Sequence, residues 1–179
     1  NFILMYAKDK KKWTSNKVYT ARGRDTRYSN YILNVSAPYQ EWKITTLTEG
    51  FARKMGVDIR EARKIAKESP QKLDEFVIEN SDAVIQPARP DIKNVGAEIR
   101  EIIKVSEANP GKVYYHHRNG YSDMYFISGK RLLFYKDKLK LIDGNLVAGE
   151  PLTTLWDDIL SNNLHNEGNV TFPKGKKPE

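Results

Sequence analysis

Three arginines separated by one or two residues occur in one stretch of this sequence, ARGRDTRYSN, residues 21–30, with Tyr19, Tyr28 and Tyr31 interleaved in and around it. Arginine can form two parallel hydrogen bonds with a phosphate or a guanine edge, and tyrosine can stack on a base or bond a phosphate. From Lys8 to Tyr28, eight lysines and arginines stand against two aspartates, which gives a net charge of +6. We call residues 8–31 the basic arm and expect it to bind nucleic acid; a solvated surface loop is the alternative. Its candidate contacts are Arg22, Arg24, Arg27, Tyr28 and Asn30.

A second basic group lies in a pair of helices predicted over residues 48–67. Thr48 can cap the first helix, Gly56 can end it in the left-handed conformation, and Asp58 can cap the second helix. Small alanines on the facing sides allow a close crossing, which is the layout of a helix-turn-helix. The alternative is an ordinary helical hairpin with a solvated, charged face. In the helix-turn-helix interpretation the outer face of the recognition helix carries Arg60, Arg63 and Lys64.

Two adjacent histidines, His116 and His117, suggest a metal site at first sight. Neighbouring side chains of a strand point to opposite faces, so these two imidazoles cannot bind one ion together, and the sequence has no cysteine to help. We therefore predict no metal site here. Arg118 and Asn119 follow at a predicted hairpin turn and are candidate DNA contacts instead.

These candidate residues must be positioned by an α+β fold. We expect about four helices, the third opening at Ser69-Pro70 and the fourth carrying an apolar face over residues 95–103, followed by a small antiparallel sheet of hairpins. Residues 8–40 are expected to be irregular. The apolar run Phe2–Ala7 predicts a short strand buried on both faces. The predicted hairpin turns are Asn119-Gly120, Ser128-Gly129 and Asp143-Gly144.

Composition bounds the function. The chain has 179 residues, of which 39% are hydrophobic and 30% charged, with a net charge of +7 and no cysteine. A folded protein with an anionic partner is expected, and duplex DNA is the first candidate. No apolar run reaches the roughly 20 residues of a membrane helix, and the apolar start lacks the basic flank of a signal peptide, so we expect a cytoplasmic protein without a membrane partner.

Several separate stretches resemble one family. They are NFILMYAKDK at the start, YSDMYFISGKRLLFYKDKLKLIDGNLV in the predicted sheet, and LTTLWDDI running to GNVTFPKGKKPE at the end. In this order they are similar to the modification subunits of type III restriction-modification systems, which belong to the β class of N6-adenine DNA methyltransferases. In that class an Asp-Pro-Pro-Tyr motif comes first, a target-recognition region follows, and a Phe-x-Gly-x-Gly loop for S-adenosylmethionine comes last.

This chain departs from the family at both chemical motifs. No Phe-x-Gly-x-Gly occurs, and the one Pro-Tyr pair, Pro38-Tyr39, follows Ala37 where the motif needs proline. The resemblance therefore implies the middle part of a longer protein: residues 1–8 end a strand of the methyltransferase core, residues 9–155 form the target-recognition domain, and residues 156–179 return toward the core. No catalytic, cofactor-binding or metal-binding residue is assigned to this chain.

The resemblance implies a DNA target-recognition domain that binds duplex DNA and selects the sequence to be methylated. The chain alone is expected to be inactive, while the parent would be an adenine-specific methyltransferase that uses S-adenosylmethionine. Its partners would be DNA, the missing methyltransferase core, a second modification subunit and a restriction subunit. Two alternatives remain open: a free-standing winged-helix DNA-binding regulator, and a metal-dependent nuclease, which would need carboxylates clustered on strands.

Overall fold

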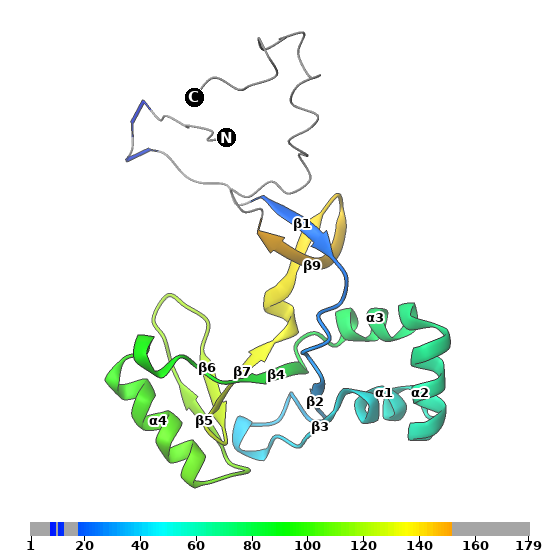
Figure 1. The fold of residues 1–179 in the computed structure, drawn as a ribbon, viewed down its shortest axis with the longest axis horizontal. Coiled ribbons are helices and arrows are strands. Elements are labelled where there is room, and N and C mark those ends of the chain that lie inside the picture. Colours follow the sequence, from blue (N-terminus) through cyan, green and yellow to red (C-terminus); the bar gives the residue numbers. More distant parts are fainter. Residues whose placement is uncertain (1–7, 10, 13–17, 152–179) are drawn as a thin grey trace, which may run out of the picture. The chain divides into compact units, whose positions relative to one another are not determined.

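The computed structural model describes residues 8, 9, 11, 12 and 18–151 (Figure 1). Ala21–Glu150 form one compact unit, and the flanking segments Asn1–Thr20 and Pro151–Glu179 form the other. In the flanking unit the described residues include a turn at Asp9, whose carboxylate accepts a hydrogen bond from the backbone N–H of Lys11 at 2.9 Å. The predicted strand Phe2–Ala7 and the predicted return segment 156–179 lie outside the described residues.

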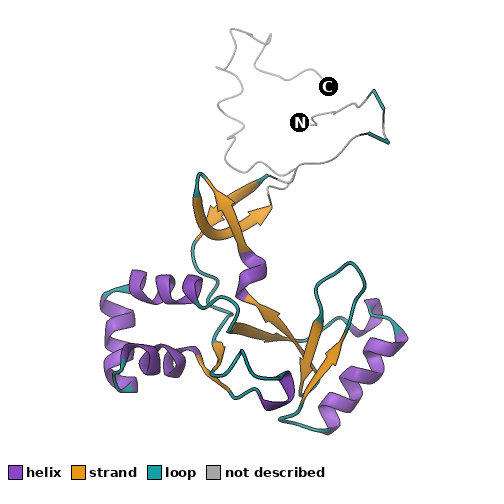
Figure 2. Cartoon of the chain, turned by 180° about the vertical axis from the view of Figure 1, so that it is seen from behind, coloured by secondary structure: helices purple, strands orange, loops and turns teal. Residues whose placement is uncertain are grey.

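The fold is α+β, as predicted, with four α-helices and a curled antiparallel sheet within the described residues (Figures 1 and 2). This sheet takes strands from both sides of the helices in sequence. In spatial order the six strands are β3 (Ile44–Thr46), β2 (Asn30–Ile32), β4 (Val84–Ala88), β7 (Lys130–Phe134), β6 (Met124–Ile127) and β5 (Val113–His116). The sequence pattern predicts the hairpins of the last third and a strand within residues 82–90, which is β4, but not the strands β2 and β3.

A second, three-stranded sheet places β9 (Asn145–Pro151) between β1 (Tyr19–Arg22) and β8 (Leu139–Ile142). The segment expected to be irregular, residues 8–40, therefore contributes a strand to each sheet. The two strands have only four and three residues, and most of these are polar or aromatic, so the signal of period two is absent. Tertiary pairing overrides a weak local propensity here.

Two predicted hairpin turns are confirmed as two-residue turns with both residues at positive φ. Ser128 and Gly129, with φ of 49° and 74°, join β6 to β7, and Asp143 and Gly144, with φ of 49° and 79°, join β8 to β9. This geometry matches the right-handed twist of paired strands. Asn119-Gly120 also lies in a hairpin connection, between β5 and β6, but that loop spans residues 117–123.

Three consecutive helices follow β3: α1 (Leu47–Met55), α2 (Ile59–Glu68) and α3 (Pro70–Glu79). Thr46, and not Thr48, caps α1 by accepting a hydrogen bond from the backbone N–H of Glu49 at 3.2 Å. Gly56 ends α1 at φ 68°, as its type predicts. Two short 3₁₀ turns, η1 (Tyr39–Glu41) and η2 (Ile92–Asn94), interrupt the connections, and a third, η3 (Tyr135–Lys138), follows β7.

The fourth helix, α4 (Ala97–Ala108), covers β5 and β6. Ile103 is buried there against Met124 and Phe126, with Ile99 and Ile102 packed at the edge. The predicted apolar face of this helix is therefore confirmed.

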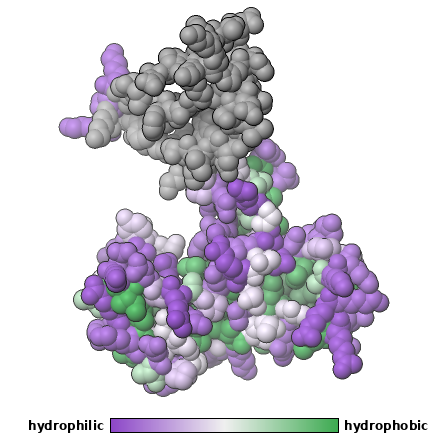
Figure 3. All heavy atoms as spheres, in the orientation of Figure 1, coloured by the Kyte–Doolittle hydropathy of each residue, from purple (hydrophilic) through white to green (hydrophobic). Residues whose placement is uncertain are grey.

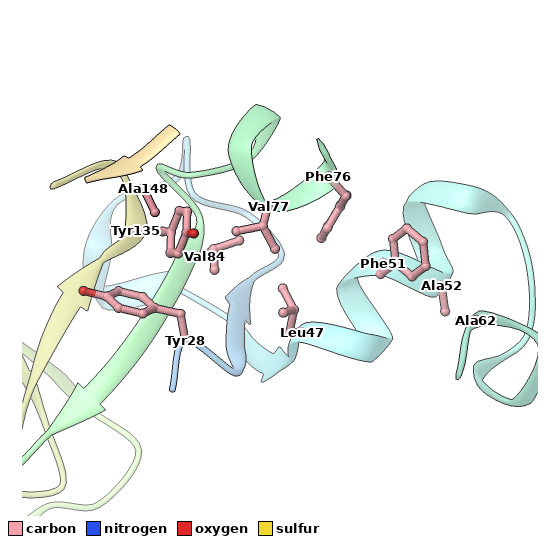
Figure 4. Packing of buried hydrophobic residues seen from close by; sticks show 10 residues of the cluster. All are labelled: Tyr28, Leu47, Phe51, Ala52, Ala62, Phe76, Val77, Val84, Tyr135 and Ala148. Carbon is pink, nitrogen blue, oxygen red and sulfur yellow. The ribbon is translucent and has the colours of Figure 1, made fainter. Parts of the chain in front are cut away.

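The largest buried cluster ties α1–α3 to the sheet (Figure 4). Phe51 and Phe76 meet edge to face, with ring centroids 5.3 Å apart. Figure 4 also shows Ala52 and Ala62 where α1 approaches α2. Both alanines are nearly inaccessible, at 3% and 0% exposed, so small side chains allow the two helices to pack closely.

Candidate nucleic-acid interface

Helix α2 presents one face made entirely of cations. Asp58 fixes its start, because the Asp58 carboxylate accepts a hydrogen bond from the Glu61 backbone N–H at 2.8 Å. Ala62 is buried against the main cluster and Ile65 packs beside it, so the opposite side of the helix must face outward. On that side lie four exposed cations at spacing i, i+3, i+4 and i+7, which share one face. This cationic face consists of Arg60, Arg63, Lys64 and Lys67.

The cationic face of α2 lacks carboxylate partners. Within residues 18–151, no ion pair joins any of its four cations to an aspartate or glutamate, although Glu61 and Glu68 lie on the same helix. In contrast, Arg53 on α1 is paired with Glu49 at 2.8 Å. The region of α1–α3 is largely hydrophilic on the face of the molecule that Figure 3 shows. These four charges are therefore available to an anionic partner.

Three candidate arginines of the basic arm line a single hollow of about 530 Å³ in the Ala21–Glu150 unit. A fourth cation, Lys138 of η3, lines it too and was missed by the sequence analysis, since no local pattern connects it to the arm. The wall includes Gly149, where an added Cβ would lie 2.7 Å from a side-chain carbon of Lys140. The cations that surround the hollow are Arg22, Arg24, Arg27 and Lys138.

Each arginine around this hollow already has a carboxylate partner. Arg22 pairs with Glu150 at 3.1 Å, Arg24 with Asp74 at 2.7 Å, and Arg27 with Asp25 at 2.6 Å. Glu150 and Asp74 are far away in sequence, so the local charge count could not include them. The three arginines of the arm are therefore paired with acids, two of which the local charge count did not include.

The three pairs differ in exposure, and this decides which arginines can change partner. The side chains of Arg22 and Arg27 are 63% and 66% exposed, whereas that of Arg24 is 21% exposed. Exposed ion pairs contribute at most about 1 kcal/mol, so a phosphate can displace Glu150 from Arg22. The Arg27 side chain is equally accessible to a phosphate, although its partner Asp25 is only 17% exposed. Arg24 instead fastens the arm to α3.

Asp25 holds the turn of the arm together. Its carboxylate accepts hydrogen bonds from Nε and Nη2 of Arg27 at 2.9 and 2.6 Å, and Lys138 Nζ lies 3.7 Å from it. The hydrogen bonds from Arg27 are the main reason that the pKa of Asp25 is below its ordinary value.

Tyr28 is a core residue and not a surface contact. Its side chain is 2% exposed, and its ring meets that of Tyr135 edge to face at 5.1 Å (Figure 4). Burial raises its pKa to about 12. The prediction that Tyr28 contacts nucleic acid is therefore wrong, because its side chain is buried. A tyrosine next to arginines can be either a surface contact or a core residue at the edge of a basic loop, and the sequence pattern does not distinguish the two. Asn30 is half-buried in β2, opposite Thr46 and Ile85.

The β5–β6 loop, residues 117–123, is organised by Asp123. This carboxylate accepts hydrogen bonds from the Tyr115 hydroxyl at 2.9 Å and the Arg118 backbone N–H at 3.3 Å, and lies 2.8 Å from His117 Nδ1. The Arg118 guanidinium lies over the Tyr121 ring, 4.7 Å from its centroid.

The tip of this loop is exposed. Asn119 is accessible, its Oδ1 lies 3.1 Å from His117 Nε2, and Tyr121 is 72% exposed. The loop is thus a pre-ordered, accessible projection that carries two of the predicted contact residues.

The two histidines point to different partners, as alternation along a strand requires. His116 faces α4, with its Nδ1 3.5 Å from Glu98, while His117 faces Asp123. Across the described residues, no group of three or more histidines and carboxylates is arranged to hold a metal ion. None of the helices described here has the length and apolar character needed to cross a bilayer.

Comparison with known proteins returned no match: no family model, no curated protein and no solved structure is similar to this chain.

Proposed function

We propose that this chain is the DNA target-recognition domain of a β-class N6-adenine methyltransferase of the type III restriction-modification kind, and that α2 is its reading helix. The cationic face of α2 carries the proposal, because it is exposed, one-sided and lacks carboxylate partners within residues 18–151. A structural helix gains nothing from four cations on one face, since like charges at i, i+4 repel each other. A polyanion opposite this face removes that cost.

The arrangement of α1 and α2 suits a helix-turn-helix. Gly56 permits the sharp turn between them, and the buried Ala52 and Ala62 let the helices cross closely. A major groove about 12 Å wide admits one α-helix, and arginine can bond O6 and N7 of a guanine from there. In this proposal Arg60, near the helix N-terminus, reads a base, while Arg63 and Lys64 lie toward the phosphates.

The other basic elements then supply affinity. Arg22 exchanges its exposed partner Glu150, and Arg27 its less exposed partner Asp25, for backbone phosphates. The β5–β6 loop brings Arg118 and Asn119 to a neighbouring part of the duplex. Phosphate contacts fix register and orientation, whereas base contacts select the sequence.

The chemistry belongs to the rest of the parent protein in this proposal. The chain lacks the motif that would hold a flipped adenine and the glycine loop that would hold S-adenosylmethionine. Calorimetry should therefore detect no micromolar binding of S-adenosylmethionine by the chain alone. The parent would act with a second modification subunit and a restriction subunit.

A free-standing winged-helix regulator is the second candidate. The ordered β5–β6 loop favours it, since a hairpin with an exposed, arginine-bearing tip can serve as a wing beside a reading helix. Residues of the parent on either side of this chain distinguish the two candidates: Asp-Pro-Pro-Tyr before it and Phe-x-Gly-x-Gly after it belong only to the methyltransferase.

Binding of labelled duplexes, measured by fluorescence anisotropy at several salt concentrations, tests the proposal. The variant with Arg63 and Lys64 both replaced by glutamine should bind duplex DNA more weakly, and the slope of log affinity against log salt should fall by roughly 0.9 for each phosphate that the variant no longer binds. Lys104→Gln on α4 is the matched control, because Lys104 is an exposed helical cation paired with Glu101 at 2.8 Å. Equal affinity and slope in the double variant and the wild type would overturn the role of α2.

A further inference from the structure

The tip of the β5–β6 loop is a tight turn that presents one amide side chain. The backbone N–H of Tyr121 donates to the carbonyl of Arg118 at 3.2 Å, which closes a β-turn around Asn119 and Gly120. Gly120, at φ 74°, takes the third position of this turn, where a positive φ favours glycine. Asn119, in the second position, is exposed. The Asn119 amide is therefore accessible to a partner that approaches the loop.

A chain of hydrogen bonds leads from the sheet to this amide. The hydroxyl of Tyr115, in β5, donates to Oδ2 of Asp123 at 2.9 Å, and Oδ1 of Asp123 lies 2.8 Å from Nδ1 of His117. On the other side of the same imidazole, Nε2 of His117 lies 3.1 Å from Oδ1 of Asn119. The Tyr115 ring is stacked on the ring of Tyr39, with centroids 5.4 Å apart. The chain of hydrogen bonds therefore starts from a packed side chain of the sheet.

The two partners of His117 determine how the Asn119 amide is turned. An oxygen atom faces each ring nitrogen, so the imidazolium form of His117 donates one hydrogen bond to Asp123 and one to Asn119. With Oδ1 of Asn119 held in this way, its Nδ2 amino group points away from the imidazole. An exposed asparagine without such a partner can present its donor and its acceptor in either order. In this loop the hydrogen bond from His117 selects one order.

An amide with its donor and acceptor in a fixed order matches one base in the major groove. Adenine presents the N7 acceptor beside the N6 amino donor, and asparagine can bond both at once. Guanine presents two acceptors, cytosine presents its amino donor, and thymine presents an acceptor and a methyl group. None of these three bases satisfies both groups of the amide. A carbonyl oxygen can accept two hydrogen bonds, so Oδ1 of Asn119 can bond adenine and keep its contact with His117.

We infer that Asn119 reads one adenine of the DNA target, and that His117 and Asp123 are positioning residues that set the orientation of its amide. The inference rests on the proposed function for the presence of DNA, and it adds the base that the loop selects. Nδ2 of Asn119 donates to N7 of the adenine, and Oδ1 accepts from N6. Because the amide is oriented before DNA binds, little side-chain entropy is lost in forming this contact.

Binding to duplex libraries randomised at each position tests the base that is read. The wild-type chain should prefer an A·T pair at one position, and Asn119→Ala should lose that preference, a change of roughly 5- to 150-fold in discrimination. A duplex with 7-deazaadenine at that position lacks the N7 acceptor. The wild-type chain should bind it roughly fivefold more weakly than the adenine duplex, as expected for one lost hydrogen bond. Asn119→Ala should bind the two duplexes equally.

Variants of His117 and Asp123 test the positioning roles. His117→Phe keeps a planar ring but cannot donate to Asn119, so it should reduce the same A·T preference, and Asp123→Asn should act in the same direction. In the Asn119→Ala background, His117→Phe should change discrimination at that position no further. His116→Phe is the matched control, because His116 is the neighbouring histidine and faces Glu98 of α4. It should leave the A·T preference unchanged.

The outcomes separate this site from the proposed function. If Asn119→Ala keeps the wild-type library profile while the Arg63 and Lys64 double variant binds weakly, the adenine contact is wrong and the proposed function stands. If neither variant affects binding, both are wrong. Loss of preference at a pair other than A·T would overturn the choice of adenine. An even loss at all positions in His117→Phe would make His117 a structural residue only.

Thermal unfolding should establish that each variant is folded. The comparison of adenine with 7-deazaadenine uses the wild-type chain and does not depend on any variant. If the wild-type chain binds these two duplexes equally at every adenine of its preferred sequence, no N7 atom is read, and the inferred contact is wrong.

Discussion

Nε of Arg24 donates a hydrogen bond to Oδ1 of Asp74 at 2.7 Å, and this contact fastens the segment after β1 to helix α3. Arg24 is the least exposed of the arm's three arginines, at 21% of its side chain. The sequence around Arg24 predicts a DNA contact, but in the structure Arg24 has a structural role.

The first prediction is that Arg24→Ala lowers stability more than it lowers DNA affinity. The free energy of unfolding should fall by about 1 kcal/mol, the scale of a partly exposed, charge-assisted pair. Urea unfolding measures the first quantity and anisotropy the second. Asp74→Ala should have a similar effect on stability, since it removes the same contact; a variant at Arg24 that is fully stable but binds DNA tenfold more weakly would contradict this role.

The second prediction concerns the pair of Arg22 and Glu150, 3.1 Å apart and both more than half exposed. Glu150→Gln should strengthen duplex binding, because it frees Arg22 and removes a negative charge from the hollow. Arg22→Gln should weaken binding about equally on all duplexes and lower the salt slope by roughly 0.9. Arg27→Gln should behave in the same way. The change in duplex affinity must be of opposite sign in the Glu150 and Arg22 variants. If both variants bind duplex DNA as the wild type does, the hollow is not part of the interface.

Much of the helical part could be predicted from the sequence because its signals are local. The Asp58 cap, the left-handed Gly56 and Pro70 at the first position of α3 each act within a few residues, and the structure confirms them. The turns at residues 128–129 and 143–144 are local in the same sense.

The sheet order and the ion pairs of the arm could not be predicted, because they are long-range. β2 pairs with β4, more than fifty residues later in the chain, and Arg22 finds Glu150 at the other end of the unit. Tyr28 and Arg131 also show that a local sequence pattern does not predict burial. A tyrosine between arginines is buried, and an arginine in the apolar run KRLLF lies unpaired inside the sheet. Only the tertiary surroundings separate a core residue from a contact residue in these cases.

The third prediction is that Arg60 acts on sequence choice and not on general affinity. Asp58 caps α2 two residues before Arg60, so this side chain leaves the first turn of the helix, where reading helices contact bases. Arg60→Ala should relax discrimination at one base pair at a cost of roughly 1–3 kcal/mol. Binding to a library of duplexes randomised at each position measures this. Lys67→Ala, on the same face, is the control and should weaken binding evenly across the library; an even loss for Arg60→Ala would make it a phosphate contact.

The fourth prediction follows from the network around Asp123. The hydrogen bond from Tyr115 is the largest cause that lowers the Asp123 pKa, and the Arg118 backbone and His117 lower it further. A carboxyl whose pKa is lower in the folded than in the unfolded chain adds stability above its ordinary value of 3.8, and that stability is lost as the pH falls through the folded pKa. The order of the β5–β6 loop should therefore persist at neutral pH and disappear only in acid.

Asp123→Asn isolates this effect, because the amide keeps the shape of the side chain but cannot carry the charge. The free energy of unfolding of the wild type should fall more steeply than that of Asp123→Asn as the pH falls from about 4 toward 2, in the window set by the lowered pKa. Tyr115→Phe removes the strongest donor to the same carboxylate and should reduce the same acid-dependent difference without changing any charge. Identical pH profiles for wild type and Asp123→Asn would mean that Asp123 does not hold the loop. The loop that presents Arg118 and Asn119 would then be held by the contact of Arg118 with Tyr121 and that of His117 with Asn119, and Tyr121→Ala should loosen it.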